Sequence, residues 1–330
     1  LTGTGGGLTL TVSLGTATET LSGSGNTYSG TTTIGANTTL ALTGSGAIAS
    51  SSLSVSSNGT FDISGTSTGA SVVTLSGSGS VLLGAKTLTV SNASTTFAGI
   101  ISDTSLGGLT LTAGTLQLSG VNTYSGATTL NGGTLRLANA TTLSSSTALV
   151  MSCSGALVLF GNSQTVASLS SSSSSSKILN SVSGTSTLTV TGGTTTFAGL
   201  IEDHESSGGL VAVSLSGGAL RLTNANTYTG ATTISGGTLH LGNTATLSTS
   251  TAVALSGTGV LDLYGNAQSL ASLSSSDATT TILNSQSGQS TLTVLGGTTT
   301  FAGLIEDHAS GSGTLALTVS GARLTLTNAN

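Results

Sequence analysis

The residues best suited to chemistry form a short acidic motif that occurs twice. Glu202, Asp203 and His204 follow the letters "FAGLI", and the same triplet follows the same five letters at 306–308, 104 residues later. Two carboxylates beside an imidazole are the groups that general acid–base catalysis or a divalent cation site uses. The motif therefore raises the question of whether the chain holds a catalytic or metal site.

Three features of the sequence argue against such a site. Neighbouring residues on a strand point to opposite faces, so the triplet converges poorly. Its two copies lie one repeat apart, about 24 Å if five coils stack at ~4.8 Å. The related first stretch, "ISDTS" at 101–105, keeps the aspartate but lacks the glutamate and histidine. We interpret the motif as a solvated coil end, with a weak cation site as the alternative, and predict no catalytic, metal-binding or cofactor-binding residue.

The composition indicates a chain made almost wholly of stacked β-strands. Only 5% of residues are charged, 49 are glycine and none is proline, while Leu, Val, Ile and Thr recur at alternate positions. Proline lacks the N–H that a strand ladder needs, so its absence suits a chain in which nearly every segment is paired on both sides. The elements that carry the acidic motif are thus expected to be strands.

The charge pattern excludes several partners. The formal net charge is −5, and the five basic residues are scattered along the chain. Binding to phosphate groups needs clustered cations, so neither nucleic acid nor an acidic membrane surface is an expected partner. The apolar runs fall well short of the roughly 20 residues of a membrane-spanning helix. We expect no membrane span in this segment.

The sequence repeats on a long period. The letters "LTVTGGTTTFAGLIEDH" at 188–204 return at 292–308 with one difference, and "NTYSG" at 26–30 returns at 122–126 and as "NTYTG" at 226–230. We expect one continuous segment over 1–330, part of a longer protein. Its predicted blocks are 26–121, 122–225 and 226–329.

A finer unit of about twenty residues lies within each block, and each unit holds at least two short alternating runs. That is the size of one coil of a parallel β-helix. We predict an all-β fold, a right-handed parallel β-helix (β-solenoid) with about five coils per 104-residue block. The predicted coil starts are Thr134, Gly155, Lys177, Thr194, Ala219 and Thr238, with gaps of 21, 22, 17, 25 and 19 residues.

The alternation also predicts which side chains point outward. In "TLHL", Leu239 and Leu241 share one face and His240 lies on the other. Equivalent outward positions hold Arg221 and Asp262, so these two and His240 could stack on adjacent coils as a charge-compensated column. We interpret that column as a solvated face with modest pairing rather than a binding site.

The segments at 122–139 and 226–243 resemble the autotransporter-associated β-strand repeat, also called the passenger-associated transport repeat. The shared pattern is Asn-Thr-Tyr, a Gly two residues on, a Thr-rich strand and then Gly-Thr-Leu-x-Leu. The first copy keeps 26–30 but has Asn-Thr-Thr-Leu in place of Gly-Thr-Leu. The matching residues are Asn122, Thr123, Tyr124, Gly126, Gly133, Thr134, Leu135 and Leu137, and Asn226, Thr227, Tyr228, Gly230, Gly237, Thr238, Leu239 and Leu241.

The resemblance implies a β-helical passenger that is exported and displayed outside a Gram-negative cell. We expect a structural fibre, stalk or adhesin segment without enzymatic activity. Its expected partners are neighbouring repeats of the same chain or identical subunits stacked end to end, with cell-surface glycans as a further possibility. The alternative function is a carbohydrate-binding or carbohydrate-degrading β-helix.

A binding array is the third class of function. Threonine runs at 31–33, 194–196 and 298–300 could form a flat surface of hydroxyl and methyl groups that meets sugars or ice. Such a surface needs Thr-x-Thr on many consecutive coils, whereas these runs are separated by whole blocks. Threonine is also simply favoured in strands.

Overall fold

The computed structural model describes residues 5–140, 142–204, 208–244, 246–307 and 312–329. These residues form an all-β parallel solenoid of about 15 turns and no helix, which confirms the predicted fold class. The right-handed sense stays a prediction. The chain divides into two compact units, Leu1–Gln164 and Thr165–Asn330.

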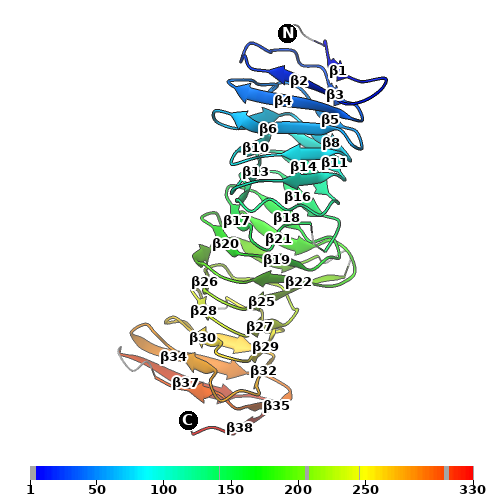
Figure 1. Ribbon diagram of the computed structural model, residues 1–330. Helices are drawn as coiled ribbons and strands as arrows, with labels where there is room; N and C mark the ends of the chain where they lie inside the picture. The colour runs from blue at the N-terminus through cyan, green and yellow to red at the C-terminus, as the bar shows by residue number, and fades with distance from the viewer. Residues whose placement is uncertain (1–4, 141, 205–207, 245, 308–311, 330) are drawn as a thin grey trace. The chain divides into compact units, whose positions relative to one another are not determined.

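In the first unit the turns contribute strands to three parallel sheets (Figure 1). One sheet runs β1 (Leu8–Leu10), β3 (Thr32–Ile34), β5 (Leu53–Val55), β8 (Leu75–Gly77), β11 (Ala93–Phe97), β14 (Gly114–Leu118), β16 (Thr134–Leu137) and β18 (Ala156–Val158). A second runs β7 (Ala70–Val72), β10 (Thr87–Val90), β13 (Gly108–Leu111), β15 (Thr128–Leu130) and β17 (Ala148–Met151). The third runs β2 (Ala17–Leu21), β4 (Thr38–Gly44), β6 (Thr60–Thr66), β9 (Ser80–Leu82) and β12 (Ile100–Ser102).

The second unit follows the same plan, and two of its sheets, the ion-pair sheet and the hydroxyl sheet, differ in their outward side chains. The ion-pair sheet runs β20 (Ser168–Ser171), β23 (Thr194–Phe197), β26 (Ala219–Leu222), β28 (Thr238–Leu241), β30 (Val260–Asp262), β33 (Thr281–Leu283) and β36 (Leu304–Ile305). The hydroxyl sheet contains β22 (Gly184–Val190), β25 (Gly209–Leu215), β27 (Thr232–Ile234), β29 (Ala252–Leu255), β32 (Ser272–Ser275), β35 (Thr298–Phe301) and β38 (Arg323–Leu326).

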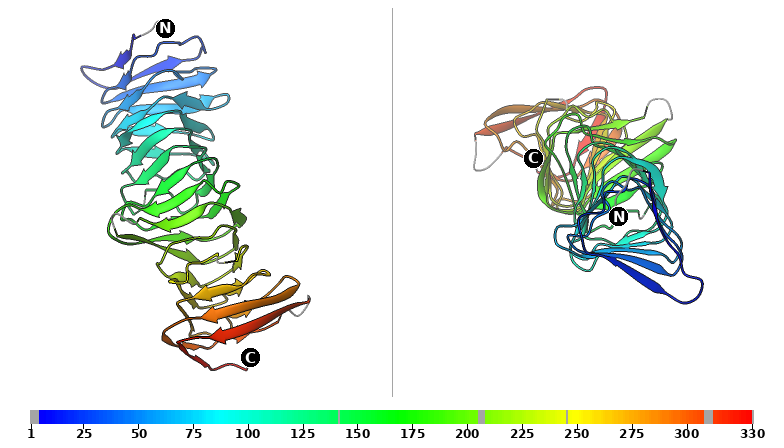
Figure 2. Two further views of the ribbon diagram at one scale, coloured as in Figure 1. Left: turned by 180° about the vertical axis from the view of Figure 1, so that it is seen from behind. Right: turned by 90° about the horizontal axis from the view of Figure 1, so that it is seen from above.

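The remaining side of the second unit is built from shorter ladders. Strands β21 (Lys177–Asn180) and β24 (Leu200–Asp203) pair with each other, and β31 (Gln268–Leu270), β34 (Gly288–Val294) and β37 (Gly313–Val319) form a sheet of their own. A short strand, β19 (Gln164–Val166), lies at the sequence boundary of the two units. Seen from above, the strands of each unit run around a common interior (Figure 2).

That interior is a stack of aliphatic side chains. In-register pairing places Leu116, Leu135 and Leu157 on three successive turns of the first unit, and all three are fully buried. Burying one leucine contributes about 1.5–3 kcal/mol, and a single turn cannot bury its own inward face. The alternating pattern of each strand therefore becomes a core only when turns stack.

The predicted coil starts are only partly right. Thr194 pairs with Ala219, and Ala219 with Thr238, as predicted. Lys177, however, pairs with Leu200 and not with Thr194, so the prediction stepped from one side of the solenoid to the next at this point. Strands on all three sides show the same alternation, and the sequence therefore gave no sign of the change.

This step reveals how the block relates to the turn. The copies of "TTTF" form β23 in the ion-pair sheet and β35 in the hydroxyl sheet. From β23 the chain makes four full turns to β33 and then passes β34 to reach β35, two thirds of a further turn. A block of 104 residues thus advances four and two-thirds turns, close to the five predicted. Each copy consequently lies on a different side of the solenoid from the copy before it.

Candidate functional site

The Asn of the repeat motif joins three successive turns through its buried side-chain amide. The Oδ1 atom of Asn226 accepts the backbone N–H of Ile201 at 2.8 Å, and its Nδ2 donates to the carbonyl of Thr246 at 2.9 Å. Asn122 makes the matching bonds to Ile101, at 2.8 Å, and to Thr142, at 2.7 Å. The Asn-Thr-Tyr segment is not part of a strand, so the side-chain amide of the Asn supplies the hydrogen bonds between turns that a strand ladder would otherwise make.

The Tyr of the motif fills the core at the same turn. Tyr124 and Tyr228 are fully buried, and their hydroxyls pair with Thr128 at 2.6 Å and Thr232 at 2.7 Å. Burial raises the pKa of both phenols above the ordinary value, because the charged form would lose its hydration. These tyrosines are packing residues.

The motif glycine marks a close approach between turns. A Cβ on Gly230 would lie 2.3 Å from the carbonyl oxygen of Val211, and one on Gly126 would lie 2.2 Å from that of Leu106. The second glycine of the pattern has positive φ, 68° at Gly133 and 72° at Gly237. At the first glycine a side chain would collide with the neighbouring turn, and at the second the positive φ would strain any residue that has a Cβ.

The aspartate of the acidic motif holds the next copy of the Asn-Thr-Tyr segment. Asp203 Oδ2 accepts the backbone N–H of Thr229 at 2.8 Å and its hydroxyl at 2.6 Å, while Oδ1 accepts the N–H of Val211 at 2.7 Å. Asp103 receives the same pair of bonds from Ser125 at 2.9 and 2.8 Å. In both repeats the carboxylate therefore binds the backbone N–H and the hydroxyl of one residue on the next turn.

The other members of that motif are not brought together into one site. Glu202 forms an ion pair with Lys177 at 3.0 Å, and the backbone N–H of His204 donates to the carbonyl of Gly209 at 2.9 Å. In the second copy Asp307 accepts the N–H of Leu315 at 2.7 Å. His308 lies outside the described residues. Within the described ranges, no three His, Cys, Asp or Glu side chains are grouped as a metal site.

The predicted stacking of Arg221, His240 and Asp262 on adjacent turns of the ion-pair sheet is confirmed, but the predicted solvation is wrong for Asp262, which is buried. Arg221 pairs with His240 and His240 with Asp262 in the parallel ladder. The Nδ1 atom of His240 lies 2.8 Å from Oδ2 of Asp262, and Asp262 is only 1% exposed. Burial opposes ionisation of Asp262, but hydrogen bonds from His240, Ser285 and the Tyr264 N–H outweigh it, so the pKa of Asp262 is lowered.

With this geometry in place, comparison with known proteins identifies the repeat. A protein-family model described as the passenger-associated transport repeat matches residues 14–42, 81–118, 113–137 and 215–241. The chain carries passenger-associated transport repeats. They are repeats of autotransporter passengers, which implies secretion to the cell surface. Neither a curated protein nor a solved structure matches the chain.

The repeats contain aromatic residues that sequence reasoning missed. The guanidinium carbon of Arg221 lies 4.3 Å from the centre of the Tyr264 ring, and the His240 ring meets Tyr264 edge-on at 5.2 Å. In the preceding repeat Arg136 lies over Phe160 at the same 4.3 Å. The shared letters "FGN" and "YGN" at 160–162 and 264–266 were the available signal.

Tyr264 and Phe160 lie in the left-handed backbone region, with φ of 52° and 54°. That conformation is costly for a bulky side chain. It directs each ring back over the arginine on the sheet. The pairing thus shields the outward arginine and offers no open site for a substrate.

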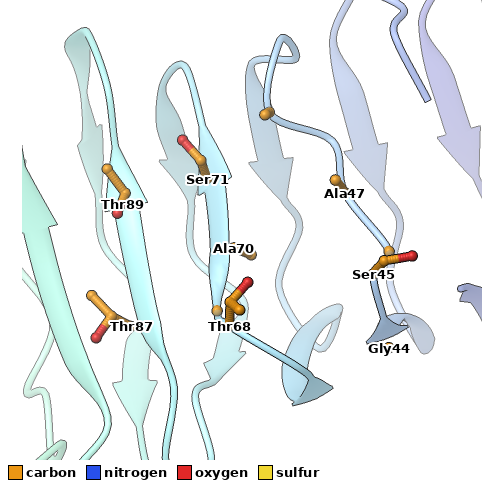
Figure 3. Close-up of a pocket in the computed structure, with 11 residues that line it drawn as sticks. Gly44, Ser45, Ala47, Thr68, Ala70, Ser71, Thr87 and Thr89 are labelled. Atoms are coloured by element: carbon orange, nitrogen blue, oxygen red, sulfur yellow. The ribbon is translucent and has the colours of Figure 1, made fainter. Parts of the chain in front are cut away.

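Shallow grooves lie on the outer surface of the repeats. One in the first unit, of about 320 Å³, forms where residues 45–49 make a loop beside β7 and β10 (Figure 3). The polar side chains that line it all carry hydroxyl groups: Ser45, Thr68, Ser71, Thr87 and Thr89. Another, of about 440 Å³, lies on the hydroxyl sheet of the second unit. None of the residues lining either groove is charged.

None of the described residues forms a helix that is long and apolar enough to cross a membrane.

Proposed function

We propose that this chain is a structural passenger segment, part of an extracellular fibre, stalk or adhesin on a Gram-negative cell. Its role is to give length and a repetitive surface rather than to catalyse a reaction. The observation that carries the proposal is the use of the motif's polar atoms. Asn226, Asp203 and Tyr228 all direct them to protein groups in their own or an adjacent turn, and none of the three presents them to a substrate.

This use of polar groups suits a spacer because it makes each turn a template for the next. Asp203 fixes the start of the following Asn-Thr-Tyr segment, and Asn226 bonds to the turn before and the turn after it. A repeat whose polar groups all serve its neighbours can be lengthened without redesign. We propose that the partners of this segment are further repeats of the same chain, or identical subunits stacked end to end.

The proposal predicts that length scales with the number of blocks. Inserting a second copy of 122–225 after residue 225 joins equivalent residues at both junctions. It adds four and two-thirds turns, or about 22 Å at ~4.8 Å per turn. Small-angle X-ray scattering of the purified chain should show this increase in maximum dimension. An unchanged dimension would mean that added repeats do not extend the stack.

Whether the fibre is one chain or many is decided by dilution. Subunits joined end to end dissociate as concentration falls, so the length of the particles should shorten on dilution. A single long chain keeps its length. Electron microscopy of cell-derived material across a hundredfold dilution distinguishes the two.

A further inference from the structure

The hydroxyl sheet of the second unit carries two outward columns of small polar side chains. The residues of the first column are partners in the strand ladder. Those of the second column lie two positions further along the chain, just past each strand, where backbone N–H groups still donate to carbonyls of the preceding turn. Strand by strand the pairs are Thr189 and Thr191, Ser214 and Ser216, Thr233 and Ser235, Ala254 and Ser256, Ser274 and Ser276, Thr300 and Ala302, and Thr325 and Thr327.

The columns join segments that have no common sequence motif. Thr233 comes from the Thr-rich strand after Asn-Thr-Tyr, Ser274 from a serine run and Thr300 from "TTTF". They meet because the successive turns of one block each place a different segment on this side of the solenoid. The threonine runs themselves stay separated by whole blocks, as predicted, but serines and threonines from other segments fill the turns of this sheet between them.

These columns are exposed or half-buried and almost free of charge. Thr233, Ser276 and Thr300 are exposed, and the strands of the sheet contain one charged residue, Arg323, at the start of β38. Asp277 borders the second column, where its carboxylate accepts the N–H of Gly257 at 2.9 Å. The hydroxyls of Thr233, Ser274 and Thr300 have no hydrogen-bond partner in the described part of the chain.

A groove interrupts the first column at its one residue without a hydroxyl. Ala254 lies between Thr233 and Ser274 in the ladder, and its small side chain forms part of the floor of the 440 Å³ groove. Thr233, Ser256, Ser274 and Thr300 line the same groove. The surface therefore has both a regular array and a recess.

We propose that this sheet binds a neutral polysaccharide laid along the solenoid axis, with a sugar ring held in the groove at Ala254. A hydroxyl both donates and accepts, which matches the hydroxyls of an uncharged sugar. Successive turns present such groups every ~4.8 Å on a rigid scaffold, so many weak bonds form at once with little ordering of the protein. This binding activity goes beyond the proposed structural role.

Other partners fit this surface less well. Its 14 outward positions hold no aromatic residue or arginine, the side chains that dominate protein interfaces. An anionic polymer would need cations, and the described strands of this sheet hold a single basic residue, Arg323. Ice requires a regular lattice, whereas the columns mix Ser, Thr and Ala. A glycan tolerates this irregularity because its own hydroxyls rotate.

The test compares retention of the purified chain on cellulose, chitin and starch, with soluble alginate as an anionic competitor. The variant is Thr233→Val, Ser274→Ala and Thr300→Val together, which keeps side-chain size close and removes three hydroxyls. The matched control is Thr194→Val, Thr196→Val and Thr238→Val on the ion-pair sheet, whose threonines also face outward. Unfolding midpoints of all three proteins establish that each is folded.

We expect retention on at least one neutral glycan, insensitivity to alginate, and a roughly tenfold or greater loss in the first variant only. Ala254→Trp, which fills the groove, should also reduce retention. Retention on none of the three glycans, equal retention by the variant and the control, or inhibition of ice growth without glycan retention would each overturn the proposal.

Discussion

The imidazole Nδ1 of His240 lies 2.8 Å from the carboxylate Oδ2 of Asp262, its ladder partner one turn further along the ion-pair sheet. The carboxylate also accepts both the N–H and the hydroxyl of Ser285. The preceding repeat has Arg136 and Val158 at the equivalent places. The pair is therefore an addition to one repeat and is not required for stacking as such.

Acid should weaken the fold through Asp262. Its pKa is lowered in the folded chain, so the carboxylate stabilises the fold above its unfolded value, about 3.9, and this stabilisation is lost as pH falls through the folded value. Asp262→Asn should therefore flatten the dependence of unfolding free energy on pH below about pH 4. Urea unfolding between pH 7 and pH 2 measures this. Asp307→Asn, at an exposed carboxylate, is the control, and equal acid dependence of the wild type and Asp262→Asn would contradict the account.

Removing the amide of Asn226 should destabilise the second unit by about 1–3 kcal/mol, because the buried N–H of Ile201 loses its acceptor and the carbonyl of Thr246 keeps only the backbone N–H of residue 226. Denaturant unfolding of Asn226→Ala checks this. Asn243→Ala, at an exposed amide with one long bond of 3.3 Å, should cost well under 1 kcal/mol. Similar losses in both variants would show that Asn226 does not bridge the turns.

Asp203→Ala should lower stability by about 2–4 kcal/mol, since three donors from neighbouring segments lose a charged acceptor. Asp307→Ala removes the acceptor of one described bond and should cost less. We expect no polysaccharide cleavage, measured as release of reducing ends, by the wild type or by either variant. Cleavage by the wild type that both changes abolish would establish the carbohydrate-degrading alternative instead.

Gly230→Ala should cost about 1–3 kcal/mol, because the added methyl would lie 2.3 Å from a backbone oxygen that cannot move independently of its strand. Gly23→Ala is the control, since a Cβ there meets nothing within 4 Å. Thermal unfolding of both variants measures the difference. Equal midpoints would mean that the turns are less closely stacked than described.

The sequence was sufficient to predict the stack, its leucine interior and the column formed by Arg221, His240 and Asp262. All three follow from alternation within strands and from spacing between adjacent turns. The side of the solenoid on which a strand lies could not be predicted, because strands on every side alternate alike. Tyr264 was missed for a different reason: its positive φ, which turns the ring toward Arg221, is unusual for an aromatic residue.

The same ambiguity concealed the hydroxyl sheet. Thr233, Ser274 and Thr300 share no motif, and their alignment depends on the lengths of the loops between them. The carboxylate of Asp203 was recognised but assigned to solvent, since its partner Thr229 lies 26 residues away.

The register at Lys177 tests the account most directly. With Cys153 replaced by Ser, the pair Lys177→Cys and Leu200→Cys occupies neighbouring ladder positions, about 4.8 Å apart and within disulfide range. The pair Lys177→Cys and Thr194→Cys lies in different sheets. Mild oxidation followed by peptide mapping should show a disulfide in the first protein and none in the second. The opposite result would contradict both the stacking of turns and the four-and-two-thirds-turn advance of the block.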